Sequence, residues 1–261
     1  MTTDLVRHYA DDAENIRLAR SPHGRLEFLR TQEILRRILT TPATVLDVGG
    51  GTGVHAEWLA RDGHTVHLID VVPAHVDAAA MLPGVTAQLG DARELPVADG
   101  SVVAVLMLGP LYHLIDPADR AGALAEARRV LRPGGVLAAA GISRYLSAME
   151  TGTNGTLDAD MITSVEAVIA TGRYDGHVGF TPTYWHTADE LRVEIQAAGL
   201  HDVEVYGIEG PGWAALDAAG IDEFPRRMHA ALHCARLVEQ DPLLINASAH
   251  FLAFGREPSA T

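Results

Sequence analysis

The sequence contains no lysine: all 20 basic side chains are arginines, against 34 acidic ones, for a formal net charge of −14. The absence of lysine excludes Schiff-base chemistry, the anchoring of pyridoxal phosphate and the phosphate-binding lysine of a P-loop. The acidic balance argues against nucleic acid as a partner, because such binding depends on neutralising phosphates with Lys and Arg. The densest basic clusters, such as Arg36-Arg37, are only two residues long, and the sequence contains no basic stripe.

Cysteine and long apolar runs are scarce as well. The one cysteine, Cys234, excludes an internal disulfide, and such chains are usually found in a reducing cytosol. No apolar run reaches the roughly 18 residues of a membrane span, and residues 1–17 are charged where a signal peptide would be apolar. We therefore expect a cytoplasmic protein with no membrane partner.

Short apolar runs alternate with helical segments between residues 44 and 140. Apolar runs of this kind are typical of strands, and here they lie at residues 44–48, 65–69, 85–89, 101–108 and 136–140. Strands that alternate with helices form βαβ units and a parallel sheet. Two further strands are expected at 203–208 and 248–255. The sequence thus predicts an α/β fold with a doubly wound, mostly parallel, seven-stranded sheet and helices on both faces.

The other segments are expected to surround this sheet within a single domain, residues 1–261. An amphipathic helix precedes the first strand, so residues 1–42 are predicted to form a helical lid. Residues 43–142 are the predicted cofactor-binding half. The alternation stops at 143–186, where one helix (158–170) and no clear strand are expected, and this insertion is predicted to shape the substrate pocket. Residues 187–261 complete the sheet, after a capping box of Thr187 and Glu190.

Four glycines in five residues follow the first expected strand, within the range 49–53. Glycines between a strand and a helix allow the backbone to approach a ligand at the open edge of a parallel sheet. Gly51-x-Gly53-x-x-Ala56, with Asp70 19 residues after Gly51, satisfies the dinucleotide fingerprint. This pattern by itself indicates an NAD(P)-dependent oxidoreductase, although a Tyr-x-x-x-Lys pair is excluded.

A wider pattern resembles the class I S-adenosylmethionine-dependent methyltransferases, whose first motif places an acid two residues before G-x-G-x-G. Here that motif is Asp47-x-Gly49-x-Gly51-x-Gly53. The resemblance continues in register through Ile69-Asp70-Val71, Gly90-Asp91-Ala92, Leu95-Pro96, Asp99-Gly100-Ser101 and Leu131–Gly135. It covers residues 40–142 closely and 187–255 loosely. A bacterial subgroup that acts on small molecules is also similar at Gly24–Glu27, Leu108–Leu114 and Thr187–Leu191.

The resemblance implies S-adenosylmethionine as the cofactor. Asp47 would attract its ammonium group, or would only cap the glycine loop. Asp70 would accept both ribose hydroxyls, or would only cap a helix. Asp91 would accept from the adenine amine, with the Ala92 N–H near a ring nitrogen. The implied cofactor contacts are Asp47, Gly49, Gly51, Gly53, Asp70, Val71, Asp91, Ala92 and Leu108.

The resemblance further implies a small, hydrophobic or aromatic methyl acceptor, with oxygen, nitrogen and carbon all open as the methylated atom. His113, after the fourth expected strand, is either a general base for a protonated acceptor or a residue that shapes the pocket. Tyr112 either positions the acceptor or packs beneath the lid. Other predicted acceptor contacts are Tyr9, Arg144, Tyr184, Trp185 and His186.

The thirteen histidines do not predict a metal site. His64 and His67 are three apart on a strand and point to opposite faces, while His229 and His233 share a helix face without a third ligand nearby in sequence. A homodimer is left open. Besides methyl transfer, two functions stay as alternatives: an NAD(P)-dependent oxidoreductase, and a protein that binds S-adenosylmethionine without transferring its methyl group.

Overall fold

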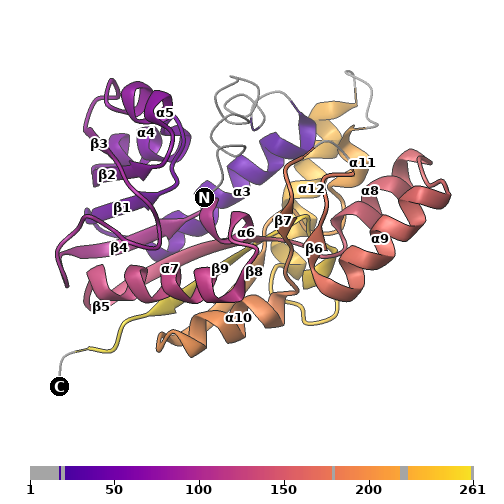
Figure 1. Ribbon diagram of the computed structural model, residues 1–261. Coiled ribbons are helices and arrows are strands. Elements are labelled where there is room, and N and C mark those ends of the chain that lie inside the picture. The colour runs from indigo at the N-terminus through magenta and orange to yellow at the C-terminus, as the bar shows by residue number, and fades with distance from the viewer. Residues whose placement is uncertain (1–17, 19–20, 178–179, 218–222, 260–261) are drawn as a thin grey trace.

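The computed structural model describes residues 18, 21–177, 180–217 and 223–259. Seven strands form one sheet in the order β3-β2-β1-β4-β5-β9-β8 (Figure 1). The first five of these are parallel neighbours, and β9 is antiparallel to both β5 and β8. This arrangement confirms the predicted mostly parallel sheet. The strands are β1 (Thr44–Val48), β2 (Thr65–Asp70), β3 (Val85–Leu89), β4 (Val102–Met107), β5 (Leu131–Ile142), β8 (His201–Gly207) and β9 (His250–Arg256).

Helices cover both faces of the sheet because successive strand residues point to opposite sides. Val45 and Leu68 belong to the apolar cluster beneath α3 (Pro22–Ile38), α4 (Val54–Arg61) and α5 (Pro73–Ala79). Leu46 and Ile69, one residue further along, belong to the cluster on the other face. That face is covered by α6 (Pro110–His113), α7 (Pro117–Val130) and α10 (Ala188–Ala197). The predicted capping box of Thr187 and Glu190 opens α10.

The insertion contains more regular structure than the sequence predicts. The expected helix is α9 (Ala159–Thr171), but a second helix, α8 (Leu146–Asn154), precedes it. Two short strands, β6 (Arg173–Tyr174) and β7 (Thr183–Tyr184), pair antiparallel. The prediction of one helix and no strand was therefore wrong. The sequence of α8 is rich in residues with weak helix propensity, and a two-residue strand is too short to show alternation.

The C-terminal part returns to the sheet after α11 (Ala214–Asp217), α12 (Phe224–Val238) and the short 3₁₀ helix η2 (Ile245–Ala247). The fully buried Arg30 links α3 to this part: its Nε donates to the Ile208 carbonyl at 3.1 Å, and its guanidinium pairs with Glu33 and Glu239. Among the described residues, no helix combines the length and apolar character needed to cross a bilayer.

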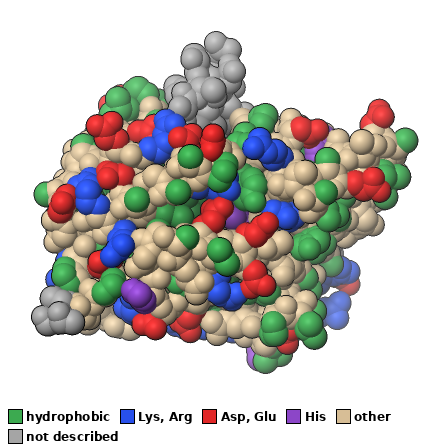
Figure 2. Space-filling view, turned by 60° about the horizontal axis from the view of Figure 1, so that its bottom comes forward, with side chains coloured by type: hydrophobic (Ala, Val, Ile, Leu, Met, Phe, Trp, Pro, Cys, Tyr) green, Lys and Arg blue, Asp and Glu red, His purple; other side chains and the backbone are tan. Residues whose placement is uncertain are grey.

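Charges of both signs are interspersed over the face of the molecule in Figure 2. Within the described part of that face, arginines alternate with acidic side chains and form no continuous basic area. Many of the arginines are paired, as Arg36 is with Asp62 and Arg129 with Glu126. The arginines therefore contribute mainly to ion pairs within the protein.

Candidate functional site

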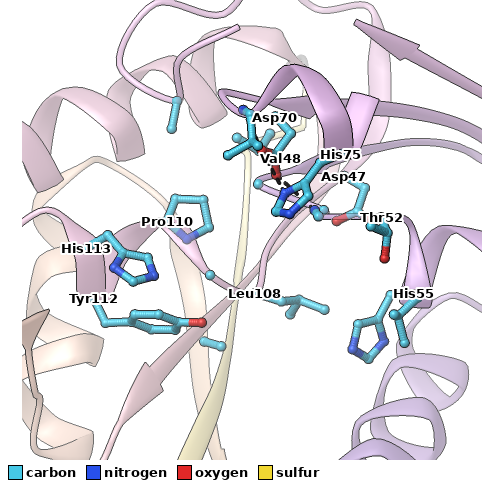
Figure 3. Close-up of a pocket in the computed structure, with 18 of the residues that line it drawn as sticks. Asp47, Val48, Thr52, His55, Asp70, His75, Leu108, Pro110, Tyr112 and His113 are labelled. Carbon is cyan, nitrogen blue, oxygen red and sulfur yellow. Dashed lines mark hydrogen bonds and ion pairs between the residues drawn. The ribbon is translucent and has the colours of Figure 1, made fainter. Parts of the chain in front are cut away.

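A cavity opens at the edge of the sheet where the parallel strands end. Its walls include the glycine loop after β1, residues 70–72 and His75 after β2, and residues 108–110, 112 and 113 after β4. Figure 3 shows Tyr112 and His113 on one side of the cavity and Thr52 and His55 on the opposite side. Glu27 of α3 and His250 of β9 also line it. Ligands of doubly wound folds bind at this edge.

The glycine loop requires glycine for two separate reasons. Gly49, Gly51 and Gly53 have φ angles of 68°, 59° and 90°, which lie in the left-handed region. A Cβ atom on Gly50 would lie 2.6 Å from Asp47 Oδ2, and one on Gly49 would lie 2.7 Å from Pro110 Cγ. The loop therefore combines a special backbone conformation with close contacts to β1 and α6.

Asp47 is a buried carboxylate beneath this loop, with 1% of its surface exposed. Its Oδ2 atom has no hydrogen-bond partner. Burial, and next to it the negative charge of Asp70, raises the pKa of the Asp47 carboxyl to about 7. An unpartnered buried carboxylate is unfavourable by itself. A cationic ligand group beside it would remove that penalty, so the site fits a cofactor with positive charge.

Asp70 ends β2 and ties the glycine loop to the start of α5. Its Oδ2 accepts from the Gly51 N–H and its Oδ1 from the Val72 N–H, both at 2.9 Å. The ring of the buried His75 lies 3.3 Å from the same Oδ1 atom, and Figure 3 shows this pair at the cavity wall. The carboxylate is thus held in a fixed orientation at the position where the sequence places a ribose contact.

Asp91 is engaged by its own neighbour. The Arg93 side chain donates to both carboxylate oxygens, from Nη2 at 2.7 Å and from Nε at 3.0 Å. The hydrogen bond from Arg93 holds the pKa of the Asp91 carboxyl below its usual value. Gly90 and Ala92 line the cavity, whereas Asp91 is not among the lining residues. Its contact with adenine stays a prediction, as do the contacts of Ala92, Val71 and Leu108, which do line the cavity.

Tyr112 and His113 form the aromatic side of the cavity. Both lie on the short helix α6, and their ring centroids are 4.6 Å apart. Phe180, from the insertion, packs against them at 6.4 Å from Tyr112 and 5.8 Å from His113. The structure therefore brings the predicted base to the cavity, beside an aromatic ring that could not be assigned from sequence.

Four predicted acceptor contacts lie elsewhere. Arg144 pairs with Glu190 at 2.6 Å, His186 is fully buried with Nε2 3.3 Å from Glu194, and Trp185 stacks on Tyr174. Arg144 and His186 thus tie the insertion to α10. None of the four predicted contacts lines the cavity: Arg144, Tyr184, Trp185 and His186. Tyr9 lies outside the described residues.

A second polar group at the cavity joins residues far apart in sequence. One ligand-type atom from each of Glu27, Glu209 and His250 lies within 4.8 Å of the other two. Both oxygens of the buried Glu209 already accept hydrogen bonds, from His250 Nδ1 at 2.6 Å and from Ser248 Oγ at 2.8 Å. This is the pattern of a hydrogen-bonded network rather than of a metal-binding site. Among the sequence motifs, Gly24–Glu27 contains one member of this cluster, Glu27.

Comparisons with known proteins agree with the motifs. Residues 45–135 match a methyltransferase domain family. An uncharacterized methyltransferase of Mycobacterium sp. strain KMS is 33% identical over 195 residues, which are 72% of this chain and 67% of that protein. One from Mycobacterium tuberculosis is 45% identical over 94 residues, or 36% of this chain and 37% of that protein. The chain thus matches little more than a third of the latter's length.

Solved structures share the fold at low sequence identity. The 1,6-didemethyltoxoflavin-N1-methyltransferase of Burkholderia thailandensis, solved with its substrate and S-adenosylhomocysteine, has a TM-score of 0.59 at 18% identity, covering 98% of this chain and 87% of that one. The [4+2]-cyclase SpnF has a TM-score of 0.54 at 21% identity, covering 90% and 82%. With the motifs, the sheet order and the relatives in agreement, this chain belongs to the class I S-adenosylmethionine-dependent methyltransferases.

Proposed function

We propose that this protein transfers the methyl group of S-adenosylmethionine to a small, hydrophobic or aromatic acceptor. The observation that carries the proposal is the pair of buried carboxylates at the ends of β1 and β2. Asp47 and Asp70 flank the glycine loop, and an oxygen of Asp47 is unpartnered. A cofactor with a cationic end and a ribose diol matches this pair in charge and in hydrogen-bonding capacity.

The proposed roles of the cofactor-side residues follow from their positions. When bound, S-adenosylmethionine supplies a methyl group already activated on a positively charged sulfur. Asp47 attracts the ammonium group, Asp70 accepts the ribose hydroxyls, and the glycines let the backbone approach the ligand. Alignment and exclusion of water are then the main tasks of the protein.

The acceptor side is proposed from the composition of the opposite wall. Pro110, Ala140 and Ile208 provide apolar surface, and Tyr112 adds an aromatic ring. Such a wall favours a small molecule with an apolar or aromatic body. We propose one domain for the whole chain, in which residues 43–142 bind the cofactor, 143–186 support the acceptor wall and 1–42 form a lid.

Thermal unfolding in the presence of S-adenosylhomocysteine tests the cofactor assignment. A ligand at 100 times its dissociation constant stabilises a protein by about 2.7 kcal/mol, which for a chain of this size raises Tm by about 5–10 °C. We expect such a shift with S-adenosylhomocysteine and none with NADH. A shift with NADH alone would overturn the proposal.

A second candidate function is binding of the cofactor without methyl transfer. The fold similarity to a [4+2]-cyclase supports this second candidate, because the name of that protein gives a reaction other than methyl transfer. Its TM-score of 0.54 equals or exceeds those of some of the methyltransferase structures. Incubation with methyl-labelled S-adenosylmethionine and a panel of small acceptors separates the two. A methylated product supports transfer, whereas tight binding without any labelled product supports the second candidate.

A further inference from the structure

His250, which lines the cavity, is paired with the fully buried Glu209. His250 is the first residue of β9, and Glu209 lies two residues after the end of β8, its antiparallel neighbour. We propose that His250 is the general base of the reaction, that Glu209 positions it, and that the acceptor is therefore a hydroxyl compound such as a phenol or an enol. This inference rests on the proposed function.

Glu209 is held in place from several directions. Its side chain is fully buried. Oε1 accepts from His250 Nδ1 at 2.6 Å, and Oε2 accepts from Ser248 Oγ at 2.8 Å and from the His250 N–H at 2.9 Å. Ser248 Oγ in turn accepts from the backbone N–H groups of Glu209 and Gly210, at 2.8 and 3.1 Å. The carboxylate has little freedom to rotate, and its position fixes that of the imidazole.

This contact selects the tautomer of His250. An ionised carboxylate only accepts hydrogen bonds, so Nδ1 must carry the proton that it shares with Glu209. In a neutral imidazole, Nε2 is then the basic atom. His250 lines the cavity, so this nitrogen is the one suited to take a proton from a bound acceptor. A carboxylate that orients a histidine and stabilises its imidazolium is the arrangement used in Ser-His-Asp triads.

The charges around His250 favour its protonated form during the reaction. Glu209 lies against Nδ1, and Glu27 of α3 approaches the same atom at 3.8 Å. Arg30, also on α3, contacts this region through the Ile208 carbonyl, and its charge is met by Glu33 and Glu239. The local balance is therefore negative, which stabilises an imidazolium.

The proton balance explains the assignment to a hydroxyl. The O–H proton moves to His250 Nε2 while an oxygen lone pair forms the new O–C bond to the methyl carbon. The C–S bond breaks and its electron pair stays on sulfur, which leaves as the neutral thioether of S-adenosylhomocysteine. The imidazolium then returns its proton to water. A neutral amine can attack with its own lone pair, so it does not require this pair.

His113 is the competing base, and its setting differs. It packs against Tyr112 and Phe180 on the aromatic side of the cavity. His250, in contrast, contacts a buried carboxylate at 2.6 Å. A general base gains most from a partner that stabilises its protonated form, and the contact with the buried Glu209 carboxylate is the observation that assigns this role to His250.

The test uses the full-length protein and labelled methyl transfer to phenol, catechol and aniline. His250→Ala should lower kcat on the phenols by about 10²–10⁴-fold, while the Kd for S-adenosylhomocysteine changes less than about twofold. Added imidazole should restore part of the lost rate. Glu209→Gln should lower kcat and move the acidic limb of the pH–rate profile to lower pH, because the imidazolium loses its charged partner. His229→Ala, an exposed histidine of α12, is the matched control.

Several results would overturn the inference. The inference is rejected if His250→Ala turns over phenols at the wild-type rate, or if turnover is lost in His113→Ala only. It is also rejected if the wild type methylates aniline but no phenol. Loss of activity with EDTA and its recovery with Mg²⁺ would replace the base by a metal site. If the wild type binds no S-adenosylhomocysteine, the proposed function falls as well, whereas normal binding with unchanged His250→Ala turnover rejects this inference alone.

Discussion

At the scale of single residues, Asp47 combines burial, an unpartnered oxygen and a pKa near 7. Its native state keeps the proton that the unfolded chain releases near pH 4. This carboxyl therefore stabilises the fold below its unfolded pKa, and the contribution is lost as pH rises to about 7. Asp47→Asn removes that loss, and we expect its free energy of unfolding at pH 8 to exceed that of the wild type by about 1–3 kcal/mol.

Urea unfolding of both proteins at pH 5 and pH 8 measures this difference. The gain should shrink at pH 5, where the wild-type carboxyl is mostly protonated. The same variant should bind S-adenosylhomocysteine more weakly than the wild type does, because the ammonium group of the ligand loses its negative partner. If the wild type and Asp47→Asn have the same free energy of unfolding at both pH values, the Asp47 carboxylate is solvated or partnered in solution.

Asp70 and Asp91 should differ in their importance for the cofactor. Asp70 faces the cavity in a fixed orientation, so Asp70→Ala should weaken binding of S-adenosylhomocysteine by about 1–3 kcal/mol. Asp91→Ala should have a smaller effect, since Asp91 is not among the residues that line the cavity and its carboxylate is paired with Arg93. Isothermal titration calorimetry measures both, with the exposed Asp77→Ala of α5 as the control. Unchanged affinity in Asp70→Ala would reject the ribose contact.

The residues that sequence could bring together are those at the ends of neighbouring parallel strands. Asp47, the glycines and Asp70 are of this kind, because motif spacing alone brings them to one edge of the sheet. Glu27, Glu209 and His250 meet only through the pairing of β8 with β9 and the packing of α3. Asp91 shows a further limit, since spacing cannot tell that Arg93 turns back onto it.

At the scale of elements, the glycine loop depends on its contact with β1. A methyl group on Gly50 would meet Asp47 Oδ2 and Leu68 Cδ1, both at 2.6 Å. Gly50→Ala should therefore lower the free energy of unfolding by about 1–3 kcal/mol and weaken cofactor binding. Gly122→Ala, on α7 with open space around it, is the control and should raise stability by about 0.5–1 kcal/mol. Urea unfolding that shows no loss for Gly50→Ala would mean the loop can move away from β1.

The elements differ in how far the sequence predicts them. Most strands of the sheet were predicted to within two residues because apolar runs between helices stand out, as at 44–48 and 85–89, whereas β5 begins at Leu131, five residues before the predicted start. The insertion was not, because α8 buries only Ser147 and Thr151 and has no apolar stripe. The predicted acceptor contacts at residues 184–186 do not line the cavity, for a related reason. Aromatic side chains beside an insertion are as well suited to anchor it as to face a ligand, and here Trp185 stacks on Tyr174.

At the scale of the whole molecule, the proposed lid can be followed by proteolysis. Residues 1–17, 19 and 20 lie outside the described residues, but Leu18 lines the cavity. A chain without lysine is cut by trypsin only at arginine, and Arg7, Arg17 and Arg20 are in this segment. We expect S-adenosylhomocysteine to slow cleavage at Arg17 by several-fold, because a bound ligand would contact the neighbouring Leu18.

Mass spectrometry of timed digests measures that protection. Cleavage at Arg226, an exposed side chain of α12, provides the internal control, since it lies outside the proposed lid. Equal rates at Arg17 with and without the ligand would argue that residues 1–42 do not close over the cofactor. Protection at both sites to the same degree would instead report general stabilisation.

The residues that line the cavity come from two stretches of the chain. The loops after β1, β2 and β4 lie within the region that matches the methyltransferase family, whereas Ile208 and His250 lie beyond its end. Mutations at Ile208 thus need not disturb the glycine loop. Over evolutionary time, a gene with this layout can keep its ancestral cofactor chemistry while drift and selection in its 3′ half produce new acceptor preferences. Paralogues are then expected to diverge fastest around β8 and the start of β9.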